Sequence, residues 1–281
     1  MRAAVALLLL LSPAILGAGV PELALPEGMS ARWVIEPSKG ERGADASFSV
    51  DPKGTVWFGV GDMVFAPTRN ILFRTGRQID QLLWLGDLQL VRSGAVLGRF
   101  EALKDPPKGM PAVRLTSVTE TPFSSWRMAA AGGGGICVAG YNPHKQVSQI
   151  ALLGPRAGTS GIQVLYETEA QISDVACDGK TAYFAAGGAV WKVAGAGRPA
   201  EVFYAQPRRA VRRIALNPGG GLFYGTDETV GYAGENARFD FMRCSRCRLA
   251  VAKGSLYILK DRVSGGVVRI EGVGAFSLLR L

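Results

Sequence analysis

The sequence has few of the side chains that catalysis and metal binding most often use. Its 281 residues include one histidine, His144, and four cysteines. No Ser-His-Asp arrangement can be argued here, and a lone loop histidine without an orienting partner is a weak general base. The run Gly132–Gly135 precedes neither a helix nor a Lys-Ser/Thr pair, so it does not resemble a phosphate-binding loop. We therefore expect a protein that is not an enzyme and carries no cofactor.

Long apolar runs are also scarce. Residues 1–19 have the features of a signal peptide: Arg2 supplies a positive n-region, an apolar core follows, and small residues at 17–19 suit a signal peptidase. The alternative is an uncleaved anchor, which a short run interrupted by Pro13 disfavours. No later segment reaches spanning length, so we predict an exported protein, periplasmic or extracellular, without a membrane span in its mature chain.

Helical spacing of apolar residues is missing from the mature chain, whereas short alternating runs between glycine turns are frequent. Glycine occurs 37 times, with no collagen-like period. The stretch Asp174–Ala205 shows the unit: four short runs are separated by turn signals at Asp178-Gly179, Gly187-Gly188 and Gly195–Pro199. A four-stranded meander of this kind cannot bury both of its faces alone, so we expect stacked copies.

Six copies of this unit follow one another when the segments are aligned on their first hairpin turn. The aligned glycines are Gly54, Gly86, Gly133, Gly179, Gly219 and Gly254. Their separations of 32, 47, 46, 40 and 35 residues average 40, which is typical of propellers with four strands per blade. Small residues in the first strand suit a crowded axis, and aromatic residues in the second strand fill the space between sheets. A two-sheet sandwich is the rival fold, and five or seven blades follow if the second copy is misread.

The period and turn chemistry of residues 46–281 resemble six-bladed β-propellers of the broad NHL, gluconolactonase and TolB-like group. The resemblance implies an all-β fold of six four-stranded antiparallel blades, preceded here by an N-terminal arm of residues 20–45. It also implies that a chain end closes the ring: Ala31–Pro37 or Ala275–Leu281 is the outer strand of the sixth blade, and we favour the first. Gluconolactonase-like enzymes hold a metal with Glu, Asn and Asp. The corresponding positions here are apolar, which speaks against a metal site: Val50, Ala130, Ala176, Ala215 and Ala250.

Cys244 and Cys247 form a CxxC motif. A four-ligand zinc site lacks ligands, because there is no second CxxC and only one histidine. Arg248 stands where c-type haem attachment needs histidine, and a thioredoxin-type redox site needs a helix N-terminus. Export to an oxidising compartment makes a local disulfide the favoured state. Cys137 and Cys177 are either bridged near the opposite face or are buried free thiols.

Positive charge is in excess, with a formal net charge of +9. Many arginines fall in loops that enter blades, and in a propeller these loops share one face with the loops between second and third strands. We therefore expect them to converge on one mouth of the central channel, where guanidinium groups bind carboxylates or phosphates. The alternative is that they are solvated or pair with Asp174, Asp227 and Glu228. The candidate binding residues are Arg127, His144, Lys145, Arg208, Arg209, Arg212, Arg213, Arg243, Arg246 and Arg248.

The sequence thus predicts an exported, non-catalytic binding or scaffold propeller that engages an acidic protein or an anionic envelope polymer through an Arg-rich face. A second hypothesis is a propeller hydrolase or lyase that works in the channel mouth with His144 or with loop carboxylates. A third is a subunit of a larger assembly.

Overall fold

The structure is a computed structural model. It describes residues 23–37, 46–69, 71–102, 113–131, 134–153, 161–179, 181–206, 208–260 and 266–279. The predicted signal peptide, residues 1–19, and residues 38–45 of the N-terminal arm lie outside the described residues. Within the described ranges, no helix is long and apolar enough to cross a membrane.

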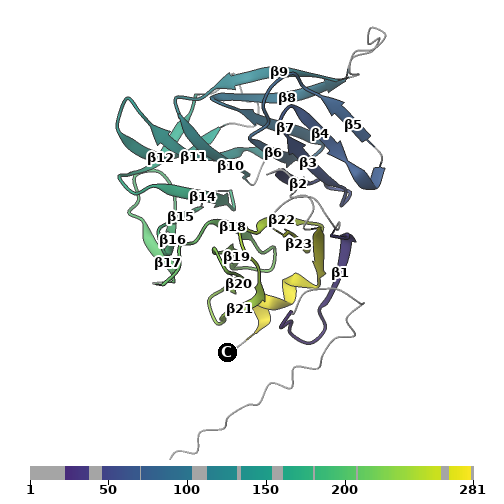
Figure 1. Ribbon diagram of the computed structural model, residues 1–281. Coiled ribbons are helices and arrows are strands. Elements are labelled where there is room, and N and C mark those ends of the chain that lie inside the picture. Colours follow the sequence, from purple (N-terminus) through teal and green to yellow (C-terminus); the bar gives the residue numbers. More distant parts are fainter. Residues whose placement is uncertain are drawn as a thin grey trace, which may run out of the picture.

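Six four-stranded antiparallel sheets surround a common centre (Figure 1). The sheets, which we call blades 1 to 6, have the following strands. Blade 1 is β2 (Ser47–Val50), β3 (Val56–Val60), β4 (Met63–Ala66) and β5 (Ile71–Arg74); blade 2 is β6 (Gln81–Leu85), β7 (Leu88–Ser93), β8 (Val96–Ala102) and β9 (Val113–Glu120); blade 3 is β10 (Ser125–Ala130), β11 (Ile136–Asn142), β12 (Val147–Leu153) and β13 (Gln163–Thr168). Blade 4 is β14 (Ile172–Cys177), β15 (Ala182–Ala186), β16 (Ala189–Val193) and β17 (Glu201–Ala205); blade 5 is β18 (Arg213–Leu216), β19 (Leu222–Gly225), β20 (Thr229–Ala233) and β21 (Arg238–Arg243); blade 6 is β22 (Arg248–Ala252), β23 (Ser255–Leu259), β24 (Val267–Glu271) and β1 (Ser30–Ile35).

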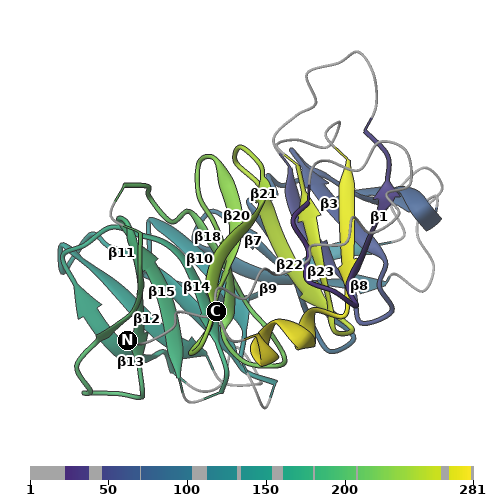
Figure 2. The same ribbon diagram turned by 90° about the horizontal axis from the view of Figure 1, so that it is seen from below.

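The inner strands β2, β6, β10, β14, β18 and β22 each contact the next, and β22 contacts β2, so the ring is closed. Seen from the side, the sheets form a flattened body (Figure 2). The all-β, six-bladed fold predicted from the sequence is therefore confirmed, and the second copy is a blade. The sandwich alternative is wrong, because each sheet packs against two neighbours instead of one.

The outer strand of blade 6 comes from the N-terminal part of the chain. Strand β1 pairs antiparallel with β24, from Ser30 opposite Glu271 to Ile35 opposite Val267. Before it, the chain crosses blade 5, where Leu23 forms an isolated bridge with Met242. The C-terminal candidate for the same position is not a strand: Val273–Leu278 is a 3-10 helix.

The hydrophobic core consists of six clusters, one at each interface between neighbouring blades. Aromatic residues of the second strands pack in five of them, as the sequence predicted, whereas the cluster between blades 2 and 3 contains Phe123, which precedes β10, and Trp126 of β10. Because side chains alternate along a strand, neighbours enter different interfaces: Trp57 packs between blades 1 and 2, and Phe58 between blades 6 and 1. Likewise, Phe223 packs between blades 5 and 6, beside the buried Phe276 of the 3-10 helix.

The β2–β3 turn shows how local sequence builds these blades. The Asp51 carboxylate accepts hydrogen bonds from the Lys53 and Thr55 amides, each at 2.8 Å, and from the Trp57 indole at 3.2 Å. Gly54 has φ +86°, a conformation that glycine adopts without steric cost. The hydrogen bonds from the backbone and the indole hold the pKa of Asp51 below its ordinary value, against the opposing effect of burial, which is the largest single contribution.

Candidate functional site

A cavity of about 260 Å³ opens at one mouth of the central channel. It lies where the inner strands begin, so its charged side chains come from five of the six blades. Two of them, Arg213 and Arg248, are the first residues of β18 and β22. Its charged lining consists of Arg92, Arg127, Arg213, Arg248, Asp80 and Asp174. Among the residues that the structure describes, the lining therefore has two more cationic than anionic side chains.

Arg92 is the most buried of these arginines, with 9% of its surface exposed. It lies on β7 opposite Gln81 of β6, its Nη1 is 3.9 Å from Asp80 Oδ2, and its guanidinium stands 5.7 Å from the centre of the Trp126 ring. Burial lowers the pKa of Arg92 to about 10, although the Asp80 carboxylate opposes this. Its Nε–H is buried without a hydrogen-bond partner among the described residues. An unpaired buried donor is costly, so this group adds to the energetic cost of burying Arg92.

Arg127 and Arg213 stand on either side of Asp174 in the order of the blades. Burial, and then the charge of Arg213, lower the pKa of Arg127, while Asp174 and Asp80 oppose this. Arg213 donates from Nη1 to the Arg212 carbonyl oxygen at 2.7 Å, and Arg127 donates to the Trp126 carbonyl oxygen at 3.3 Å. Neither guanidinium is in a direct ion pair with any carboxylate that the structure describes. The two cations therefore repel each other across a partly dehydrated site.

Asp174 is buried, with 8% of its surface exposed. Burial raises the pKa of its carboxyl above the ordinary value, while Arg213, the Ile214 amide and Arg127 act in the opposite direction. Its Oδ2 accepts a hydrogen bond from the Ile214 backbone N–H at 3.0 Å. Asp174 thus joins blade 4 to blade 5 as well as facing the arginines.

Two further polar side chains of the mouth join neighbouring blades in the same way. Gln81 accepts from the Met128 N–H at 3.0 Å and donates to the Met128 carbonyl oxygen at 2.7 Å, which connects blades 2 and 3. Ser47 Oγ accepts from the Leu82 N–H at 2.6 Å, which connects blades 1 and 2. The polar atoms of these two neutral side chains take part in hydrogen bonds between blades, so the arginines dominate the chemistry of the cavity.

Of the ten binding residues predicted from the sequence, Arg127, Arg213 and Arg248 line this cavity. Two others form the pairs that the alternative interpretation proposed: Arg212 with Asp227 at 3.2 Å, and Arg209 with Glu228 at 2.9 Å and Asp240 at 3.4 Å. Exposed on the outer surface are Arg208, His144, Lys145, Arg243 and Arg246. Lys145 pairs there with Glu167 at 2.8 Å, and Arg209 and Arg243 border a separate cavity of about 560 Å³ beside the N-terminal arm.

Sequence reasoning missed Arg92, Asp80 and Gln81. Arg92 belongs to a second strand, whose side chains we expected between sheets and not at the axis. The β6–β7 hairpin could have identified Arg92. Pairing residues outward from the turn at Gly86 places Arg92 opposite Gln81, next to Asp80 at the entrance of blade 2.

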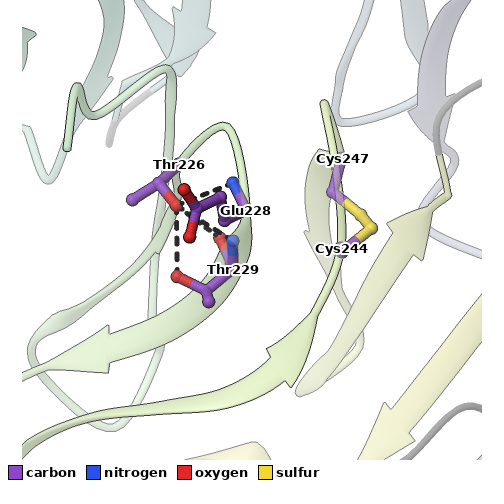
Figure 3. Close-up of a disulfide and its surroundings, with 5 residues drawn as sticks. All are labelled: Thr226, Glu228, Thr229, Cys244 and Cys247. Atoms are coloured by element: carbon purple, nitrogen blue, oxygen red, sulfur yellow. Dashed lines mark hydrogen bonds between the residues drawn. A yellow bond between two sulfur atoms is a disulfide. The ribbon is translucent and has the colours of Figure 1, made fainter.

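The predicted disulfide between Cys244 and Cys247 is confirmed, and it fixes the segment that leads into Arg248. The Cys244 N–H donates to the Glu228 carbonyl oxygen at 2.8 Å, which attaches the segment to the neighbouring turn. Figure 3 shows the disulfide and the hydrogen bonds within that turn. In that turn Thr226 Oγ1 accepts from the Thr229 N–H at 2.9 Å. A second disulfide joins Cys137 of blade 3 to Cys177 of blade 4, whose Cα atoms are 6.2 Å apart. The alternative of buried free thiols at these two positions is therefore wrong.

Below the mouth, the channel residues do not fit a metal ion. Carboxylate, amide and carbonyl oxygens are the usual ligands of Ca²⁺ and Mg²⁺. The five apolar positions singled out in the sequence, from Val50 to Ala250, all line the channel. No group of three or more His, Cys, Asp or Glu side chains able to hold a metal ion occurs in the described ranges. Four arginines at the mouth would also repel a cation.

The structure is a six-bladed β-propeller, and similar solved structures confirm the resemblance at the level of the fold alone. Similar solved structures include a calcium-binding protein, regucalcin, from Agrobacterium tumefaciens, with 14% identity and a TM-score of 0.57 over 85% of this chain and 94% of that one. A luciferin-regenerating enzyme has 12% identity and a TM-score of 0.60 over 86% and 96%. Streptogramin B lyase has 10% identity and a TM-score of 0.53 over 86% and 97%. The sequence matches no protein-family model and no curated protein.

Proposed function

We propose that this protein is an exported, non-catalytic binding module that holds a carboxylate or phosphate group in the arginine-lined channel mouth. The observation that carries the proposal is a cavity in which Arg127 and Arg213, neither in an ion pair with a described carboxylate, lie beside Arg92 and Arg248. Guanidinium groups form paired, charge-assisted hydrogen bonds with both kinds of anion. A cavity of about 260 Å³ suits one such group better than an extended acidic surface.

The energetics of the mouth support an anion there. The charge of Arg213 lowers the pKa of Arg127, and an anion between the two guanidinium groups would oppose that effect. The rigid support of Arg248 by the Cys244–Cys247 disulfide means that little side-chain and loop entropy is lost on binding.

Export remains part of the proposal. It rests on the signal-peptide pattern of residues 1–19 and on the two disulfides, which persist in oxidising compartments. The anionic group belongs either to a free small molecule or to an acidic protein or envelope polymer that inserts one group into the mouth. Gel filtration of native extracts separates a free module from a subunit of a larger assembly.

The test is calorimetric titration of the purified protein with inorganic phosphate and with butyrate. Arg213→Ala should weaken binding roughly tenfold to a hundredfold, since hydrogen bonds to charged groups contribute about 1.5–3 kcal/mol. The matched control is Arg212→Ala, because this neighbour points to Asp227 outside the cavity. Affinity should also fall with added salt. Equal losses in both variants, or no binding of either anion, would refute the proposal.

A second candidate function is a hydrolase or lyase, and one observation favours it. Two similar structures are described as enzymes, and Asp174 is a buried carboxyl with a raised pKa inside the mouth, as general acids require. His144 does not serve this role, because it is exposed in the β11–β12 turn and is not part of the cavity lining. For this candidate, Asp174→Asn would abolish turnover and leave anion binding in place.

A further inference from the structure

The arginine-lined mouth opens into a second, deeper cavity of about 300 Å³ along the channel. The two cavities share Phe48, Gln81, Asp174 and Leu249 in their walls, so one continues into the other. The character of the walls changes over this distance. Charged side chains surround the mouth, whereas the deeper part is lined mostly by aliphatic residues of the six inner strands.

Small side chains keep this deeper part open. Ala129, Ala176, Ala215 and Ala250 come from four different inner strands and all line it. Ala215 and Ala250 are partly exposed although they lie on the innermost strands of the ring, so space accessible to solvent reaches them. Each inner strand is the edge strand of its sheet, so backbone groups share this wall with the aliphatic side chains. Covering the aliphatic part of the wall with an apolar group is favourable.

We propose, on the basis of the anion site above, that the ligand is an amphiphile: its carboxylate or phosphate head binds Arg127 and Arg213, and its unbranched alkyl chain occupies the channel. The head and the chain match the two parts of one continuous cavity. From Arg213 to Leu216, β18 spans about 10 Å at roughly 3.3 Å per residue, which accommodates a medium-length chain. The alanine side chains, which cannot bind a metal ion, leave room for this alkyl chain.

The prediction for affinity is a regular dependence on chain length. Each added methylene group should tighten binding about fourfold, which is the equivalent of about 0.8 kcal/mol per buried CH₂. The gain should stop when the chain reaches the far end of the bore. Octanol, which has the same chain without the charge, should bind at least tenfold more weakly than octanoate.

The experiment is calorimetry of the purified protein with butyrate, hexanoate and octanoate below their micellar concentrations, and with octyl phosphate to compare the two head groups. Ala215→Leu narrows the bore from blade 5 and Ala250→Leu narrows it from blade 6. Both variants should lose the gain in affinity with chain length. Ala205→Leu, on the exposed end of the outer strand β17, is the matched control and should keep that gain.

The outcomes separate this inference from the function on which it rests. If octanoate binds no more tightly than butyrate, while butyrate still requires Arg213, the anion site stands and the amphiphile proposal is wrong. If octanoate binds equally well to Arg213→Ala, the head group does not bind where we place it. If Ala215→Leu and Ala250→Leu both keep the gain in affinity with chain length, the alkyl chain does not lie in the channel. If neither butyrate nor phosphate binds at all, the proposed function itself fails.

Discussion

The disulfide between Cys137 and Cys177 should stabilise the ring far more than the one between Cys244 and Cys247. The first closes a loop of 40 residues and joins two blades, whereas the second spans only 3 residues within one segment. In the chain-entropy description, loops of these lengths give about 4 and about 1.6 kcal/mol of stabilisation, a difference of about 2.3 kcal/mol. All four cysteines are buried, with exposed fractions of 5% or less, so replacement by alanine removes similar contacts at each site.

The assay is urea unfolding followed by tryptophan fluorescence for two double variants, Cys137→Ala/Cys177→Ala and Cys244→Ala/Cys247→Ala. With a denaturant dependence of about 3 kcal/mol/M, their midpoints should differ by about 0.8 M. A reducing agent breaks both disulfides, so it should lower the midpoint of the unmodified protein to about 0.5 M below that of the first variant. Equal midpoints for the two variants, or a midpoint of the unmodified protein that reduction does not change, would refute the reasoning.

Two further predictions concern polar side chains of the mouth. Gln81→Ala removes both hydrogen bonds to Met128 and should lower the unfolding free energy by about 2 kcal/mol, whereas Gln163→Ala on the exposed edge strand should change it by less than about 0.5 kcal/mol; urea midpoints that do not differ contradict the role of Gln81. The second prediction is the effect of Asp174→Asn on the pH dependence of stability. The pKa of Asp174 is raised in the folded state, so the folded protein binds this proton more tightly than the unfolded chain does. Stability therefore falls as pH rises from the ordinary pKa of 3.8 through the folded value. The Asn variant should lack this fall and be more stable than the unmodified protein at neutral pH, and a parallel pH dependence of the two proteins would argue against it.

The fold could be predicted because each blade repeats the same local chemistry. The glycine turns, the small residues of the first strands and the aromatic residues of the second strands recur about every 40 residues, and each of these signals acts within a few residues of its position in the chain. Closure of blade 6 was harder to predict. Ala31–Pro37 and Ala275–Leu281 have similar strand character, and what separates them is pairing with β24 more than 200 residues from the first of them.

The site could be predicted only in part, for a different reason. Whether an arginine at a blade entrance faces the axis depends on which carboxylates lie near it, and these come from other turns of the chain. Arg212 and Arg213 are adjacent in sequence, yet the first pairs with Asp227 and the second lines the mouth. Arg212 lies just before β18, whereas Arg213 is its first residue, and the two side chains have different partners. Clustering in the sequence therefore overstated the size of the basic surface.

Some side chains of the mouth join neighbouring blades, and others are candidates for binding the ligand. Gln81 and Asp174 accept hydrogen bonds from backbone groups of the next blade, so changing either alters the ring as well as the cavity. Arg127 and Arg213 have no described ion-pair partner, and each donates to the carbonyl oxygen of the residue before it, within its own blade. Their charge is therefore less tied to inter-blade contacts than that of Asp174. It follows that variation at these arginines should change the choice of ligand at low cost to the fold, whereas variation at Gln81 should first be felt as instability.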